Sequence, residues 1–130
     1  MKNNVNPNIS IIIPCYNVAN YLRLCLNSIE IQPIGEVEYL FVNDGSTDNT
    51  LTLLTEFCAD KPYCHIINQK NAGVSAARNA ALSIAKGEYI YLLDGDDRLT
   101  DNAITAMLEC IKDESVDVVL SEVAIWKNDV

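Results

Sequence analysis

Several features that mark common protein classes are scarce or absent in this chain of 130 residues. Only 9 residues are basic against 18 acidic ones, and the net charge of −9 argues against a nucleic-acid-binding protein, which would carry a basic patch. No apolar run approaches the roughly 18 residues that a membrane-spanning helix needs. The five cysteines form no C-x-x-C pair, so neither a zinc site nor a disulfide framework is indicated, and we expect reduced, mostly buried thiols.

The N-terminus has the composition of a polar tail. Residues 1–8, MKNNVNPN, lack the apolar region of a secretory signal peptide. We therefore expect a disordered tail over residues 1–8 and one domain over residues 9–126, since a chain of this length suits one domain or a large piece of one.

What the chain does contain is a regular alternation of strand-like and helix-like segments. Five runs are expected to form strands: Ile9–Pro14, Tyr39–Asn43, Cys64–Asn68, Glu88–Leu93 and Asp117–Val123. Between them, apolar residues recur at the spacing of amphipathic helices. These are Leu22, Cys25, Leu26 and Ile29; Leu51, Leu54 and Phe57; Val74, Ala77, Ala81 and Ile84, with Gly87 as a stop; and Ile104, Met107, Leu108 and Ile111. The order predicts an α/β fold with a Rossmann-like open, mainly parallel sheet and helices on both faces.

Polar and conformationally special residues collect after the strands and not before them. Open α/β sheets bind ligands outside the carboxyl ends of their strands, so this one-sidedness predicts a site there. The four junctions that carry it are Pro14–Asn17, Asn43–Thr50, Asn68–Asn79 and Asp94–Asp97.

Each junction also has a purely structural interpretation. The pair Asp44-Gly45 suits a turn, and residues 46–48 suit a cap for the next helix. Residues 71–73 equally suit a turn, and Tyr16 could be an ordinary half-buried aromatic. Arg78 could be a solvated helix residue, although its small neighbours would let it reach a ligand at the start of the helix.

The acidic cluster after the fourth strand-like run is the strongest indication of chemistry. Asp94, Asp96 and Asp97 occupy three of four positions, with Gly95 between the first two. Oxygen ligands without nearby His or Cys suit Mg²⁺ or Mn²⁺. An EF-hand is excluded, because the twelfth position counted from Asp44 or Asp94 holds threonine instead of glutamate. A solvated acidic turn remains the alternative.

Four sequence blocks together resemble family 2 glycosyltransferases, which have the GT-A fold and transfer sugars from nucleotide-diphosphate donors. The blocks are SIIIPCYNVANYLRLCLNSI, VNDGSTDNT, NAGVSAARNAAL and GEYIYLLDGDD, and the resemblance spans Ser10 to Val123. It implies that the chain is the nucleotide-sugar-binding half of a metal-assisted, inverting transferase. The donor would be a UDP-sugar, and the acceptor a saccharide or a lipid-linked molecule.

The resemblance also implies roles for particular residues. The nucleotide-binding residues would be Pro14, Tyr16, Asn17, Asp44, Asn71, Arg78, Asp94 and Gly95. Asp44 would accept a hydrogen bond from the base, and Arg78 would lie along the diphosphate. Asp94-Gly95-Asp96 would be the D-x-D motif, with Asp96, Asp94 and Asp97 as the expected ligands of Mn²⁺ or Mg²⁺.

The family's general base has no counterpart in this sequence, and we expect it beyond Val130. A fragment that binds nucleotide and metal without catalysis is therefore an open alternative. A nucleotidyltransferase is less favoured, because it would need a Gly-rich basic loop where this chain has PCYNVANY. An oxidoreductase would need G-x-G-x-x-G at the same place. Family members often build bacterial surface polysaccharides, so a cytoplasmic location is expected, with peripheral membrane association of the full-length protein left open.

Overall fold

The computed structural model describes residues 6–120, in which strands and helices alternate. Their bounds are β1 (Ile9–Cys15), α1 (Ala19–Glu30), β2 (Val37–Asp44), α2 (Thr50–Cys58), β3 (Cys64–Gln69), α3 (Val74–Leu82), β4 (Tyr89–Leu92) and α4 (Ala103–Ile111). The first four expected strands and all four expected helices are present. Residues 117–120 of the expected fifth strand are irregular, and its residues 121–123 lie outside the described part of the chain.

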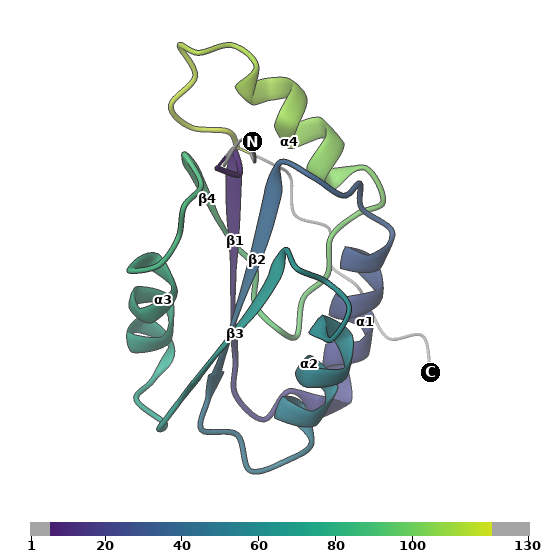
Figure 1. Ribbon diagram of the computed structural model, residues 1–130, viewed down its shortest axis with the longest axis vertical. Coiled ribbons are helices and arrows are strands. Elements are labelled where there is room, and N and C mark those ends of the chain that lie inside the picture. The colour runs from purple at the N-terminus through teal and green to yellow at the C-terminus, as the bar shows by residue number, and fades with distance from the viewer. Residues whose placement is uncertain (1–5, 121–130) are drawn as a thin grey trace, which may run out of the picture.

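The four described strands are all parallel and lie in the order β3-β2-β1-β4. The chain moves outward from β1 to β3 and then returns to the other side of β1. Right-handed crossovers in opposite directions place their helices on opposite faces of a sheet. Accordingly α3 lies on one face and α1 and α2 lie on the other, and the carboxyl ends of the strands gather at the lower end of the view (Figure 1).

The core has two parts because the sheet is covered on both faces. Alternate residues of β1 point to opposite sides, so Ile11 and Ile13 join the larger cluster with α1, α2 and α4, whereas Ile12 joins the smaller one with α3. All three side chains are fully buried. This two-sided burial explains why the strand is apolar at nearly every position. The α/β fold with helices on both faces is as the sequence predicted.

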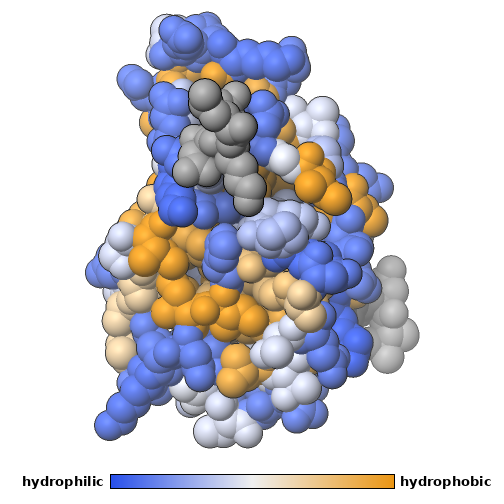
Figure 2. Space-filling model, in the orientation of Figure 1, coloured by the Kyte–Doolittle hydropathy of each residue, from blue (hydrophilic) through white to orange (hydrophobic). Residues whose placement is uncertain are grey.

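The helix α3 differs most from its sequence-based expectation. Ala77 and Ala81 are fully buried against the sheet, but Val74 is 50% exposed and Ile84 is 47% exposed. The helix ends at Leu82, so Ile84 lies beyond it. Figure 2 shows hydrophobic residues gathered over the strands next to α3, which therefore covers only part of its face of the sheet.

Gly87 has a different role from the helix stop that was expected. A Cβ at this position would overlap the backbone and side chain of Ser10 in β1. Ser10 Oγ accepts a hydrogen bond from Gly87 N at 2.8 Å and donates one to the buried Glu38 at 2.5 Å. Glu38 also accepts a hydrogen bond from Lys86 N at 2.7 Å. The glycine thus lets the chain enter β4 in close contact with β1.

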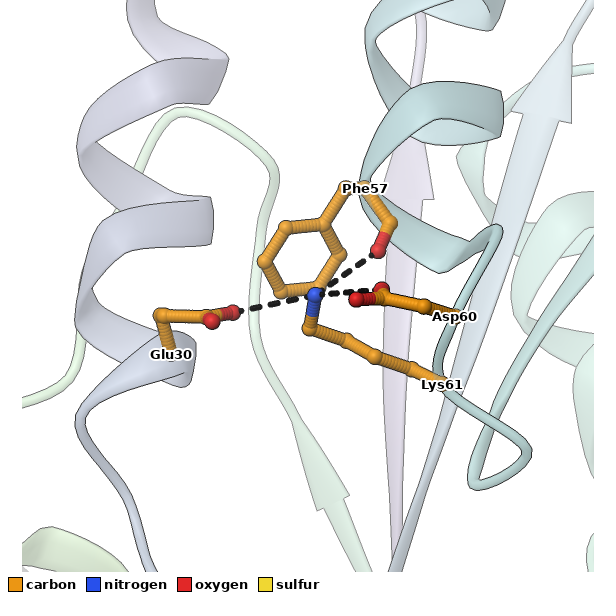
Figure 3. Close-up of polar contacts among 4 residues, drawn as sticks. All are labelled: Glu30, Phe57, Asp60 and Lys61. Atoms are coloured by element: carbon orange, nitrogen blue, oxygen red, sulfur yellow. Dashed lines mark hydrogen bonds and ion pairs between the residues drawn. The ribbon is translucent and has the colours of Figure 1, made fainter.

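A partly buried lysine joins the ends of α1 and α2 (Figure 3). Lys61 Nζ lies 3.2 Å from a carboxylate oxygen of Glu30 and 3.1 Å from one of Asp60. It donates a hydrogen bond to the carbonyl of Phe57 in the last turn of α2, at 3.0 Å, and stands 4.3 Å from the centre of the Phe57 ring. A cation is favourable at this end of a helix, where carbonyl groups lack partners.

All five cysteines are free thiols, and three of them are buried, which agrees with the expectation from composition. Among the described helices, none combines the length and the apolarity that crossing a membrane would require.

Candidate functional site

A pocket of about 540 Å³ opens where the carboxyl ends of β1, β2 and β4 meet the first turns of α3. It lies at the reversal of strand order between β1 and β4, which is where open α/β sheets bind ligands. The lining includes the following residues expected from the sequence: Pro14, Tyr16, Asp44, Asn71, Arg78, Asp94, Gly95 and Asp96. Asn17 and Asp97 are not part of this lining, and Asp97 borders a neighbouring pocket of about 520 Å³.

Asp44 is buried at the end of β2 and holds the segment that enters α3. Its Oδ1 accepts hydrogen bonds from Gln69 Nε2 at 3.0 Å and Ala72 N at 2.8 Å. Its Oδ2 accepts one from Gly73 N at 3.0 Å and a weaker one from Asn71 Nδ2 at 3.4 Å. Burial raises the pKa of Asp44, but these hydrogen bonds outweigh burial and hold the pKa below its ordinary value.

Asp44 therefore has little acceptor capacity to spare. A carboxylate offers about four lone-pair positions, and four donors already face Asp44. A ligand N–H would have to share Oδ2 with Asn71, whose bond is the longest of the four.

The turns flanking Asp44 depend on two glycines with positive φ. Gly45 has φ +70°, and a Cβ there would lie 2.5 Å from Asn71 N. Gly73 has φ +96° and precedes the first residue of α3. Both residues adopt a backbone conformation that side chains disfavour. The turn interpretation of these segments therefore holds.

Asn17 is engaged within the protein. It has φ +50°, and its Oδ1 accepts hydrogen bonds from Thr47 N at 2.7 Å and Asp48 N at 3.3 Å. Asp48 in turn accepts hydrogen bonds from Ala19 N at the start of α1 and Thr50 N at the start of α2. Burial opposes these bonds, which nevertheless lower the pKa of Asp48. The segment between β2 and α2 therefore caps the starts of both helices.

Arg78 and Asp94 form an ion pair across the pocket. Arg78 Nη2 lies 3.1 Å from Asp94 Oδ1, and the two side chains are 34% and 49% exposed. Ion pairs this exposed contribute little to stability. Arg78 Nε is buried and has no hydrogen-bond acceptor within residues 6–120.

The three acidic side chains after β4 lie close together. One carboxylate oxygen each from Asp94, Asp96 and Asp97 can be chosen so that all lie within 4.8 Å of one another. Burial, followed by the charges of Asp96 and Asp94, raises the pKa of Asp97. Arg78 offsets only part of this negative charge, and an oxygen-only donor set suits a hard divalent cation. The residues present therefore fit Mg²⁺ or Mn²⁺.

Gly95 lies against β1 as well as the pocket. A Cβ there would lie 2.9 Å from Cys15 Sγ and 3.3 Å from Pro14 O. Gly95 N also donates a 3.3 Å hydrogen bond to Pro14 O. Gly95 was expected among the nucleotide-binding residues, but its close contact with β1 by itself explains why no side chain is present. Burial raises the pKa of the Cys15 thiol, which therefore stays protonated.

Sequence reasoning missed Gln69, whose side chain holds Asp44 in place. In the parallel register, Asp44 pairs with Gln69 and Asn43 with Asn68. Both strands end in two polar residues, and their alignment at one sheet edge would have indicated this partnership.

Comparisons with known proteins agree with this arrangement. The family model described as glycosyl transferase family 2 matches residues 10–129. The chain is 42% identical over 111 residues to the chondroitin synthase of Pasteurella multocida (strain Pm70). The matched region covers 85% of this chain and 12% of that protein. The chain thus spans about an eighth of that relative.

Two solved structures share the fold. TarS 1-349 of S. aureus, in complex with UDP-GlcNAc, is 31% identical with a TM-score of 0.75, over 81% of this chain and 31% of that one. The mannosyltransferase PcManGT from Pyrobaculum calidifontis, in complex with GDP-Man and Mn²⁺, is 24% identical with a TM-score of 0.75, over 87% of this chain and 34% of that one. With a parallel α/β sheet, a crevice at its reversal point and a family match over nearly its whole length, this chain belongs to glycosyl transferase family 2.

Proposed function

We propose that this chain binds a nucleoside-diphosphate sugar, of the UDP class, together with Mn²⁺ or Mg²⁺. The observation that carries the proposal is the meeting of Asp44, Arg78 and Asp94–Asp96 in one pocket at the sheet's ligand-binding edge. Support also comes from similarity to TarS, which was solved in complex with UDP-GlcNAc, and to a chondroitin synthase.

In this proposal the nucleoside lies between the end of β1 and the segment before α3. Tyr16 is 52% exposed at the pocket, so its ring is available to pack against a base. Pro14 forms the floor, and Asn71 and Asp44 offer polar groups to the base edge. Asn17 contributes by fixing the backbone beside Tyr16.

Asp96, with Asp94 and Asp97, would hold the cation, which when bound supplies charge neutralisation for the leaving diphosphate. The positive charge of Arg78 would also neutralise charge on the diphosphate. With the ion pair to Asp94 opened, the Arg78 guanidinium would donate to phosphate oxygens. Charge-assisted bonds of this kind strengthen as charge grows on the leaving group.

For the whole protein we propose an inverting transfer of the sugar to a saccharide or lipid-linked acceptor, in the cytoplasm or at the inner face of the membrane. Residues 9–126 are then the donor-binding part, and the general base comes from beyond Val130. By itself the described part supplies donor binding, which leaves a non-catalytic binding fragment as the second candidate for this chain.

Calorimetry with UDP, with and without Mn²⁺, tests donor binding directly. We expect Mn²⁺ to strengthen UDP binding, and Asp96→Ala to remove that increase while metal-free binding persists. Asp44→Ala should weaken UDP binding in both conditions. Unchanged metal-dependent affinity in Asp96→Ala would remove the cation assignment, and unchanged affinity in Asp44→Ala would remove that residue from the nucleoside site.

Incubation with a UDP-sugar and an acceptor separates the transferase from the binding fragment. We expect the 130-residue chain to bind the donor without forming product. Efficient transfer by this chain would contradict the assignment of the base to residues beyond Val130.

A further inference from the structure

The segment that carries the acidic cluster, residues 93–102, is irregular and is attached to the protein on both sides of the acids. On the side nearer β4, Leu93 N donates to Ile12 O at 2.9 Å and Gly95 N donates to Pro14 O at 3.3 Å. These bonds attach that side to β1, whose carboxyl end lines the pocket.

On the side nearer α4, the attachment comes from two buried polar side chains at the end of α1. Ser28 is 7% exposed and Gln32 is 5% exposed. Ser28 Oγ accepts a hydrogen bond from Leu99 N at 3.0 Å and donates one to Cys25 O at 2.6 Å. The hydroxyl therefore fixes the backbone two residues after Asp97.

Gln32 makes a longer connection with its amide group. Its Nε2 donates to Ser28 O and to Thr100 O, both at 2.9 Å. Its Oε1 accepts a hydrogen bond from Ile104 N at 3.2 Å, in the first turn of α4. Both amide hydrogens and the oxygen are used, and a glutamate could supply only the acceptor.

These anchors have a consequence for the acids between them. Three carboxylates in four residues repel one another, so a free segment would spread them apart. Attachment on both sides of the acids keeps their oxygens within 4.8 Å of one another before any cation arrives. We propose that Ser28 and Gln32 are positioning residues for the cation site, an inference that rests on the proposed function.

The 130-residue chain provides the test, with Mn²⁺ alone and then UDP with and without Mn²⁺ as probes. Loss of groups that orient metal ligands typically weakens metal affinity by about 10- to 100-fold. We expect a loss of this size for Ser28→Ala and Gln32→Glu, with metal-free UDP affinity unchanged and with Ser28→Thr restoring Mn²⁺ affinity.

Ser83→Ala is the matched control. Ser83 Oγ donates to Ala80 O at 2.6 Å, a bond of the same kind, at the opposite end of α3 from the pocket. Its removal should leave Mn²⁺ affinity unchanged. Equal Mn²⁺ affinities in wild type and folded Ser28→Ala and Gln32→Glu variants would overturn the positioning role alone. A wild-type chain that binds neither Mn²⁺ nor UDP would overturn the proposed function and this inference with it.

Hydrogen exchange in the wild-type chain gives a second readout that does not depend on the variants. If the anchors and the acids are coupled, Mn²⁺ should slow exchange of the Leu99 and Ile104 amides. The Gly87 amide also donates to a serine hydroxyl, that of Ser10, but lies at the opposite end of the sheet, and its exchange should not change. Exchange at Leu99 and Ile104 that is insensitive to bound Mn²⁺ contradicts the coupling.

Discussion

At the scale of single residues, Gly95 is placed where a side chain has no room. A methyl group there would press on Cys15 Sγ and Pro14 O, and both of those residues are buried at the end of β1. We expect Gly95→Ala to lower the free energy of unfolding by about 1–3 kcal/mol, as overpacking does, and to weaken Mn²⁺ binding. Urea denaturation measures the first effect and calorimetry the second.

The double variant Gly95→Ala with Cys15→Ala provides the control for this prediction. Removing the sulfur relieves the closest contact, so part of the lost stability should return. If the stability losses of the single variants Gly95→Ala and Cys15→Ala simply add in the double variant, then the Cys15 sulfur is not what excludes a side chain at position 95.

The carboxylate of Asp44 should make stability depend on pH. Its pKa is lowered in the folded state, so it adds stability above its ordinary pKa, and that contribution is lost as pH falls through the lowered folded value. We expect Asp44→Asn to be less stable near pH 7 and to lose less stability on acidification. Denaturation curves between about pH 7 and pH 2 measure this dependence. The exposed Asp101 offers a control, and Asp101→Asn should follow the wild-type curve.

The residues of the site differ in how far the sequence could predict them. Asp44 and Asp94–Asp97 were predicted because they follow strands directly, and parallel strands end at one edge. Ser28 and Gln32 were not, because their partners lie in a segment about 70 positions away and no local pattern pairs them. Long-range hydrogen bonds of this kind depend on the packing of α1 against the segment after β4.

At the scale of elements, Lys61 connects the last turns of α1 and α2. Its Nζ is close to Glu30, Asp60 and the Phe57 carbonyl, and its side chain is only 12% exposed. We expect Lys61→Met to lower the free energy of unfolding by about 1.5–3 kcal/mol, the range for hydrogen bonds to charged groups. Chemical denaturation is the measurement.

Lys112→Met is the matched control for that prediction. Lys112 pairs with Glu109 at 2.9 Å, but both side chains are more than 70% exposed. The expected loss is within about 0.5 kcal/mol, because exposed pairs contribute little. Similar losses in the two variants would contradict the role assigned to Lys61.

The elements themselves were largely predictable, since periodicity reports which faces are buried. Two exceptions have physical causes. The alanines of α3 pack closely, but the helix ends at Leu82 before the apolar pattern ends. Gly87 marks close contact with β1 instead of a helix end. The apolar residues at 118–120 have strand-like composition but are irregular, and nothing in the described structure explains this.

At the scale of the whole molecule, a bound cation should stabilise the folded chain. A ligand that binds only the folded state adds about 2.7 kcal/mol at 100 times its dissociation constant. For a domain of this size, that corresponds to a rise in melting temperature of roughly 8–12 °C. We expect Mn²⁺ to produce such a rise and EDTA to reverse it.

Asp96→Asn should abolish this rise, whereas Asp101→Asn should retain it. The comparison is informative because each variant removes one exposed carboxylate from a chain with a net charge of −9. An equal rise in both variants would mean that Mn²⁺ acts on the overall charge and not at the acidic cluster.

The strand order β3-β2-β1-β4 also affects how the molecule folds. Strands β1, β2 and β3 follow one another along the chain, but β4 must return to pair with β1, so that Ile9 meets Tyr89. Closing so long a loop is entropically costly and slow. Until β4 docks, we expect the free edge of β1 to offer unpaired backbone groups to other chains. We therefore expect the strand order that creates the ligand crevice to make aggregation during folding most favourable just before the crevice is complete.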